Sequence, residues 1–299
     1  MSTAGADLQG EVNTSPMRVL MTGVGGPVAV SLIQTINELN PYIVGVDASA
    51  LAAGAHFVDK FYQVPMAKDR RYIGRLRELC REEHIDCAII SVDEEIAVLA
   101  GEDFSPTVMS ITNPESTLVC LDKLKFYHHL KNDFNLPPLI GKRITKPRDG
   151  RGSDGITVTA DGPRELTQAF VEGDEYTVDV LRAKEGEFLA VVPRLRIDTS
   201  AGQSIKGRTV KHEALIAVTK RLVDFLGLWG AVNAQWIIDS EGVPWLIEVN
   251  PRLAGCMAFS AAAGANIPAA LLRLLRGEQV APMDFKEMTM LRYWSAVYV

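Results

Sequence analysis

Hydrophobic and polar positions follow two different patterns along this chain, and the first pattern occupies residues 17–111. Short apolar runs predict buried strands, and apolar residues three to four positions apart predict helices between them. The expected strands are 18–21, 43–47, 87–92 and 108–111, and the expected helices are 28–39 and the stretch around 73–80. Strands and helices in alternation favour a parallel sheet with helices on both faces. This pattern predicts a Rossmann-like lobe.

The pattern changes after residue 111. One helix is predicted over 121–134 and is ended by Pro137 and Pro138. A short strand then enters a Gly-rich loop, and longer strands follow with helices between and after them. The expected strands are 143–146, 156–159, 175–181, 188–194, 231–238 and 245–249, and the expected helices are 213–226 and 265–275. We therefore expect an α/β protein whose C-terminal half is α+β, with an antiparallel sheet.

The last two of these strands form a predicted β-hairpin with an unusual polar pattern. The apolar runs 235–239 and 245–252 flank the turn 240–244. Glu248, Asn250 and Arg252 fall on one face because side chains alternate along a strand. A carboxylate, an amide and a guanidinium suit hard cations and phosphate oxygens, and Gln235 adds an amide from the partner strand. From these residues alone, a half-solvated strand with ordinary surface groups is an equal alternative.

Composition excludes several classes of protein. The 299 residues carry a formal net charge of −6, so no global basic field is available for nucleic acid. No apolar run approaches the length of a membrane span. Residues 1–16 resemble a tail rather than a signal peptide, and the four dispersed cysteines lack zinc-type spacing. We expect a cytoplasmic protein with reduced thiols and neither nucleic-acid nor membrane partners.

Two Gly-rich turns could approach phosphates. Gly23-Val24-Gly25-Gly26, with Asp47 ending the next strand, partly fits a dinucleotide fingerprint, but Val28 occupies the third glycine position. A dehydrogenase is accordingly the weakest alternative. The loop 149–155 has three glycines and follows Lys146, so its backbone N–H groups could wrap phosphates. A plain hairpin turn is the alternative for this loop.

A group of basic residues is a candidate substrate site. Arg194 and Arg196 share one face of a strand, and a following loop adds Lys206 and Arg208. Together they could bind a carboxylate substrate or an acyl phosphate. The equal alternative is a charged strand edge that discourages pairing.

A group of acidic residues lies at the end of a strand in the first lobe. Ligands of open α/β sheets bind at the carboxyl ends of strands, so Asp93 and Glu95 could face an amine-bearing substrate. The favoured alternative is that Glu94 and Glu95 begin a helix, where acidic side chains interact well with the helix dipole.

Taken in order, these segments resemble the ATP-grasp superfamily over about residues 17–299, and most closely its carbamoyl-phosphate-synthetase-like, stand-alone ligases. The matching features are the Rossmann-like lobe, a Leu-Asp-Lys helix start, Lys-Pro before a Gly-rich loop, the Glu172–Val180 strand and the Gln…Glu-x-Asn-Pro-Arg hairpin. The resemblance implies a tail (1–16), a Rossmann-like pre-ATP-grasp domain (17–111), a linker helix with a small lid subdomain (112–172) and a Mg/ATP domain (173–299). Only 22 residues separate Lys123 from Lys146, so the lid is expected to be reduced.

The resemblance also implies a role for each matched position. Lys123 and Lys146 would contact the ATP phosphates, beneath a loop containing Gly150, Gly152, Ser153 and Gly155. The backbone at Ala169 and Phe170, after Gln168, would hold adenine, and Glu175 would hold the ribose. Gln235, Glu248 and Asn250 would ligate Mg²⁺, with Mn²⁺ as an alternative ion. Arg252 would stabilise the transferring phosphoryl group or the acyl phosphate, and Lys146 and Arg194 are the other candidate catalytic residues.

The activity implied is that of a Mg-ATP-dependent carboxylate–amine ligase. ATP would phosphorylate a small-molecule carboxylate, and an amine would attack the acyl phosphate to form an amide. Two alternatives stay open. One is formation of a carboxyphosphate or carbamoyl phosphate, and the other is a non-catalytic, ATP-binding regulatory protein whose reduced lid prevents turnover. A homodimer is compatible with the resemblance.

Overall fold

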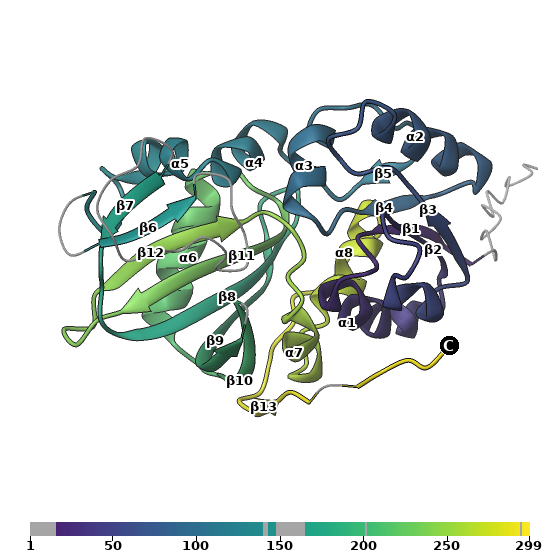
Figure 1. Ribbon diagram of the computed structural model, residues 1–299. Coiled ribbons are helices and arrows are strands. Elements are labelled where there is room, and N and C mark those ends of the chain that lie inside the picture. Colours follow the sequence, from purple (N-terminus) through teal and green to yellow (C-terminus); the bar gives the residue numbers. More distant parts are fainter. Residues whose placement is uncertain (1–15, 140–142, 148–164, 201, 294) are drawn as a thin grey trace, which may run out of the picture.

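The N-terminal lobe is built on a five-stranded parallel sheet with strand order β3-β2-β1-β4-β5 (Figure 1). In this computed structural model, residues 16–139, 143–147, 165–200, 202–293 and 295–299 are described. The strands are β1 (Arg18–Thr22), β2 (Tyr42–Asp47), β3 (Lys60–Gln63), β4 (Cys87–Ile89) and β5 (Val108–Met109). The helices are α1 (Pro27–Ile36), α2 (Tyr72–Glu82) and α3 (Asp93–Leu99), with 3-10 turns η1 (Asn37–Leu39) and η2 (Ala53–Phe57).

The predicted parallel sheet is confirmed, but the sequence pattern missed β3. Its four residues, Lys-Phe-Tyr-Gln, are exposed or half-buried, so they offer no buried apolar run. The predicted tail lies almost entirely outside the described residues.

The helix predicted at 121–134 is present as the shorter α5 (Lys123–Leu130), and the helix before it, α4 (Pro114–Leu121), was not predicted. Asp122 has an extended backbone and accepts hydrogen bonds from the N–H groups of Leu124 and Lys125, both at 3.1 Å. It therefore caps the start of α5 and separates this helix from α4. The two-stranded sheet of β6 (Arg143–Pro147) and β7 (Glu165–Ala169) follows. The expected strand 156–159 lies outside the described residues.

A six-stranded antiparallel sheet forms the C-terminal part, in the order β12-β11-β8-β9-β10-β13. Its strands are β8 (Asp174–Arg182), β9 (Phe188–Ser200), β10 (Gln203–Thr209), β11 (Gly230–Ile238), β12 (Pro244–Asn250) and β13 (Thr289–Leu291). The stretch 200–208, predicted as a loop, is therefore the end of β9 followed by β10. Its inward positions are Ser204, Gly207 and Thr209, which give no apolar alternation from which to predict a strand.

One face of this sheet is apolar and packs on α6 (Glu213–Phe225). Val178, Trp236 and Val249 point to that side and share a core with Leu215 and Leu222 of the helix. Removal of this surface from water is the main term that holds α6 to the sheet. Because side chains alternate, the residues between them point to the opposite face.

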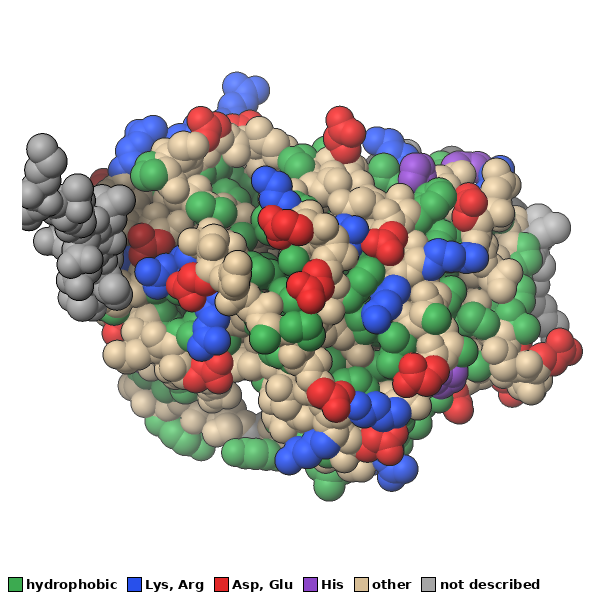
Figure 2. Space-filling model, turned by 180° about the vertical axis from the view of Figure 1, so that it is seen from behind, with side chains coloured by type: hydrophobic (Ala, Val, Ile, Leu, Met, Phe, Trp, Pro, Cys, Tyr) green, Lys and Arg blue, Asp and Glu red, His purple; other side chains and the backbone are tan. Residues whose placement is uncertain are grey.

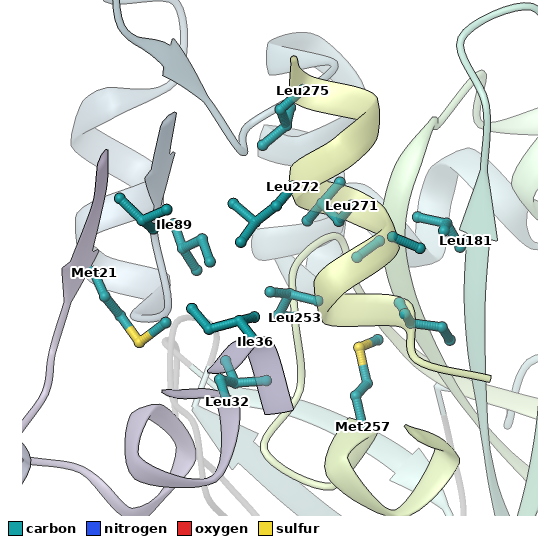
Figure 3. Close-up of a cluster of buried hydrophobic side chains, with 14 of the residues drawn as sticks. Met21, Leu32, Ile36, Ile89, Leu181, Leu253, Met257, Leu271, Leu272 and Leu275 are labelled. Atoms are coloured by element: carbon teal, nitrogen blue, oxygen red, sulfur yellow. The ribbon is translucent and has the colours of Figure 1, made fainter. Parts of the chain in front are cut away.

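A second core joins the N-terminal lobe to the C-terminal helices α7 (Met257–Ala262) and α8 (Ile267–Leu275), as Figure 3 shows. Met21, Ile36 and Ile89 of the lobe lie in one cluster with Met257 and Leu272. The proposed division into domains remains a prediction, but its parts 17–111 and 173–299 share this apolar core. They are thus held in a fixed relation by burial rather than by a flexible linker.

Acidic and basic side chains are interspersed over the face seen in Figure 2, without one large area of either sign. Within the described ranges, no helix is long and apolar enough to cross a membrane.

Candidate functional site

The face of the six-stranded sheet opposite α6 is lined with polar side chains, and we call it the polar face. Strand register places these side chains in adjacent rows, with Gln235 between Thr177 and Glu248, and Asn233 between Asp179 and Asn250. The full set is Glu175, Thr177 and Asp179 on β8, Arg194 and Arg196 on β9, Asn233 and Gln235 on β11, and Glu248 and Asn250 on β12.

The predicted hairpin of β11 and β12 is confirmed, and it brings three of the predicted metal ligands together. Gln235 and Glu248 are directly paired across the two strands. The Asn250 side-chain amide donates a hydrogen bond of 3.0 Å to Glu248 Oε1. All three side chains are half-buried, so they can be reached from solvent.

Arg252 lies just beyond β12 and connects the two lobes. Its guanidinium makes a two-point ion pair with Asp93, in which Nη2 lies 3.1 Å from Oδ2, and the same Nη2 lies 3.4 Å from Asn250 Oδ1. Burial by itself would lower the pKa of Arg252, but Asp93 and, further away, Glu248 and Glu94 raise it. The guanidinium is thus held beside the candidate ligands by an acid from the other lobe. Asp93, proposed as a substrate residue, is the partner in this pair.

Arg196 occupies the centre of the open part of the polar face. Its guanidinium forms an ion pair with Glu175 and donates hydrogen bonds to Gln235 Oε1 at 3.3 Å and to the carbonyl of Gly202 at 2.7 Å. The Arg196 side chain is 6% exposed, whereas Glu175 is 37% exposed. The structure therefore places Arg196 directly beside a predicted ribose ligand and a predicted metal ligand.

Arg194 has a different environment, although it lies only two residues away. It is 2% exposed and makes hydrogen bonds of 2.7 and 2.9 Å to both carboxylate oxygens of Asp179. Asn233 and Ser260 also donate to that carboxylate. This buried network leaves Arg194 no access to a substrate, so its predicted catalytic and substrate roles do not fit this conformation. The pattern analysis missed Asp179 and Asn233, although both continue the alternation of Glu175 and Gln235.

The predicted cluster of four basic residues is not formed. Arg208 is paired across the sheet with Leu195, so it points away from the polar face, and it is exposed beside Thr289. Lys206 is exposed and forms a 3.1 Å ion pair with Asp198. Only Arg196 of the four reaches the candidate site. The alternative, a charged strand edge, describes Lys206 and Arg208 better.

The acidic residues after β4 begin α3, as the favoured alternative predicted. Glu95 is 8% exposed, and its Oε2 has no hydrogen-bond partner within the described residues. Burial raises its pKa to about 7, a shift that the hydroxyls of Thr22 and Tyr72 oppose and the charges of Asp47 and Glu94 assist. Glu95 is thus enclosed in the lobe, and the described structure gives it no open path to a substrate.

Asp47, the acidic residue that a dinucleotide site would need, already has hydrogen-bond partners within the lobe. Asp47 accepts hydrogen bonds from the backbone N–H groups of Gly25, at 2.7 Å, and Ser49, at 2.8 Å. A Cβ at Gly25 would lie 2.8 Å from Asp47 Oδ2, so glycine is needed for this close approach. The glycines of this turn therefore have a structural explanation within the lobe.

The remaining predicted nucleotide contacts are partly described. Lys123 begins α5, and Lys146 is a backbone position of β6, opposite Leu166. The loop residues Gly150, Gly152, Ser153 and Gly155 lie outside the described residues. Gln168 is buried and bonds to the Pro137 carbonyl at 3.0 Å.

The predicted adenine contact at the end of β7 needs one correction. The Ala169 N–H already donates to the Pro138 carbonyl at 2.7 Å, which removes that donor from the adenine contact. Phe170, next to it, is 62% exposed.

Comparisons with known proteins agree with this arrangement. A family profile described as "ATP-grasp in the biosynthetic pathway with Ter operon" matches residues 162–296, and one described as "PylC-like, N-terminal domain" matches residues 19–112. The carbamoyl phosphate synthase large chain of Gemmatimonas aurantiaca is 23% identical over 268 residues, which are 88% of this chain and 22% of that protein. A D-alanine–D-alanine ligase of Magnetococcus marinus is 25% identical over 183 residues, 51% of this chain and 57% of the relative.

Solved structures share the fold. The N5-carboxyaminoimidazole synthetase of Staphylococcus aureus, solved with ADP, superposes with a TM-score of 0.73 at 14% identity, over 93% of this chain and 82% of that chain. This chain spans about a fifth of the length of the carbamoyl phosphate synthase chain and somewhat over half of the length of the D-alanine–D-alanine ligase. The family profiles cover the lobe and the polar-face domain in the order that the resemblance required. Residues 162–296, which contain the polar face, belong to the ATP-grasp superfamily.

Proposed function

We propose that the protein is an ATP-dependent carboxylate–amine ligase that acts through an acyl phosphate. The observation that carries the proposal is the paired Gln235 and Glu248 with Asn250 beside them, next to an arginine held in place from the opposite lobe. Phosphoryl transfer needs positioning and neutralisation of charge more than a covalent partner, and this is what the arrangement offers.

The donor set of the polar face fits Mg²⁺. Glu248 offers a carboxylate, and Gln235 and Asn250 offer amide oxygens on the same face. Mg²⁺ prefers oxygen ligands and usually takes one or two carboxylates together with phosphate oxygens and water. When bound with ATP, the ion would neutralise phosphate charge. Mn²⁺ accepts the same ligands, so we propose it as an alternative ion.

In this proposal the chain's own residues position and stabilise the reacting groups. The edge of the Arg252 guanidinium that is turned away from Asp93 would face the phosphoryl group during transfer, because a guanidinium can donate to more than one oxygen acceptor at once. Asp93 fixes the orientation of the guanidinium by pairing with its Nε and Nη2. Lys123 and Lys146 are proposed to hold the phosphates, and Glu175 the ribose.

The relatives differ in their reactions, so the substrate is a separate proposal. We propose a small-molecule carboxylate and an amine. The second candidate is a carboxyphosphate-type transfer, favoured by the alignment of 88% of this chain with a carbamoyl phosphate synthase. The four free, buried cysteines support a reducing compartment, for which we propose the cytoplasm, and a homodimer remains a proposal from the family alone.

The test is ADP release with Mg²⁺, ATP and a panel of carboxylates, with hydroxylamine added to trap an acyl phosphate as a hydroxamate. Carboxylate-dependent hydroxamate that disappears in Glu248→Ala supports the ligase. ADP release that needs only bicarbonate supports the second candidate. ADP release unchanged in both Glu248→Ala and Lys146→Ala would overturn the assignment of the site, and tight ATP binding without any turnover would favour a regulatory protein.

A further inference from the structure

The guanidinium of Arg196 lies among oxygen atoms that the proposed function assigns to the nucleotide and the metal. It is paired with the Glu175 carboxylate and donates to Gln235 Oε1, the only atom of that side chain able to ligate a cation. The buried positive charge of Arg196 thus lies beside Gln235 Oε1, the atom that a divalent cation would use as a ligand. This inference rests on the proposed function of the same site.

The positive charge of Arg196 would repel a divalent cation, so the two compete for the same position. Among the candidate ligands only Glu248 is a carboxylate, and Asn250 already donates to its Oε1. A divalent cation brought to this face alone would meet one carboxylate and the positive charge of Arg196. The Arg196 side chain is only 6% exposed, so water screens this repulsion less than it would between two surface charges. We expect the chain without nucleotide to bind the metal weakly.

Nucleotide phosphates would change this balance, because they attract both cations. The Arg196 Nε is buried and has no hydrogen-bond partner within the described residues, so the guanidinium still has an unused donor. Phosphate oxygens bind a guanidinium fork strongly. A guanidinium drawn to the phosphates leaves Gln235 Oε1 free for the metal.

We propose that Arg196 couples the two ligands: it keeps a divalent cation away from Gln235 until nucleotide phosphates take over its guanidinium. Such a coupling is reciprocal, so metal and nucleotide strengthen each other's binding by one common factor. The site then binds the metal–nucleotide pair in preference to either part.

The test measures Mn²⁺ binding with and without ADP, by electron paramagnetic resonance and calorimetry, which need no turnover. In Arg196→Gln, nucleotide-free Mn²⁺ binding should tighten about tenfold, and the coupling factor between Mn²⁺ and ADP should fall by about the same factor. Arg196→Lys keeps the charge and should keep the weak nucleotide-free binding. Lys206→Gln removes an exposed cation that is paired with Asp198, so both quantities should stay unchanged.

Unchanged nucleotide-free Mn²⁺ affinity and unchanged coupling in Arg196→Gln would overturn this inference and leave the proposed function intact. If the wild-type chain binds no ADP with Mn²⁺, the proposed function itself fails. Arg196→Met provides a second uncharged variant for a buried position, so the comparison survives if the glutamine variant does not fold. Thermal unfolding of each variant establishes that it is folded.

Discussion

Arg194 and Arg196 lie two residues apart on β9 and point to the same face of the sheet, but the surroundings of their side chains differ. Arg194 is enclosed beneath α7, where Asp179, Asn233 and Ser260 complete its surroundings. Arg196 has partners that face the open part of the polar face, including a Glu175 side chain that is 37% exposed. The same residue type on the same strand is thus part of a fully buried network at Arg194 and lies beside a half-exposed acid, Glu175, at Arg196.

The buried environment of Arg194 can be tested by removing its acidic partner, Asp179. Asp179→Ala leaves Arg194 buried without its counter-charge, so unfolding free energy should fall by about 3–5 kcal/mol. Urea denaturation gives the value. The matched control is Asp198→Ala, whose ion pair with Lys206 is exposed on both sides and should change stability by less than about 1 kcal/mol. Equal effects in the two variants would show that the network does not hold the sheet.

Glu95 sharpens the comparison, because it is a buried acid for which the described structure shows no cationic partner. Burial raises its pKa from 4.5 to about 7. Between these values the folded chain keeps a proton that the unfolded chain has lost, so stability falls as pH rises from about 4.5 to 7.

Glu95→Gln mimics the protonated side chain and removes this dependence. The variant should match the wild type at pH 4 or below and exceed it above pH 8 by about 3 kcal/mol, which follows from the size of the pKa shift. Thermal or urea unfolding at both pH values measures the difference. A difference between the two proteins that does not vary with pH would contradict the buried, raised-pKa description.

The solvent-accessible part of the polar face is tested by Glu248→Gln, which removes the only carboxylate among the three proposed metal ligands. ATP-dependent turnover should fall about 100-fold or more, while stability changes little because the side chain is half-buried and solvent-accessible. Steady-state ADP release measures the change. Glu241→Gln, in the exposed turn of the same hairpin, should retain wild-type turnover.

The smallest expected effect concerns the contact between the lobes. Asp93→Asn keeps the shape of the side chain but weakens its hold on Arg252, so kcat/KM for ATP should fall about tenfold through loss of positioning. Asp284→Asn weakens an exposed ion pair with Lys211 far from the polar face, and it should leave kcat/KM unchanged. An unaltered kcat/KM in Asp93→Asn would mean that Arg252 needs no support from the other lobe.

Local pattern determined much of the fold. Alternating strands and helices predicted the parallel lobe, and the hairpin of β11 and β12 followed from two apolar runs around a turn. Prediction failed where the apolar signal was weak or interrupted. β3 and β10 carry few buried apolar side chains, and the eight-residue helix α4, which was not predicted, has only two buried residues, Thr117 and Cys120.

The candidate site was predictable in part for the same reason. A period of two places Glu248 and Asn250 on one face of their strand, so the sequence by itself determined that these two side chains lie together. Gln235 lies opposite Glu248 because the register of the hairpin shifts between Gln235 and Trp236. The sequence also put Arg194 and Arg196 on one face. Alternation fixes the direction in which each side chain points, because it is a property of the single strand.

Only the tertiary structure decided which of these side chains are buried and which partners they have. Ser260 of α7 reaches the carboxylate that holds Arg194, and Asp93, 159 residues away in the chain, reaches Arg252 from the other lobe. Strand register and helix packing depend on contacts between distant segments, which no local pattern contains. For this reason the sequence determined the chemistry of the polar face, whereas the packing of α7 and the N-terminal lobe decided which part of that face can bind a ligand.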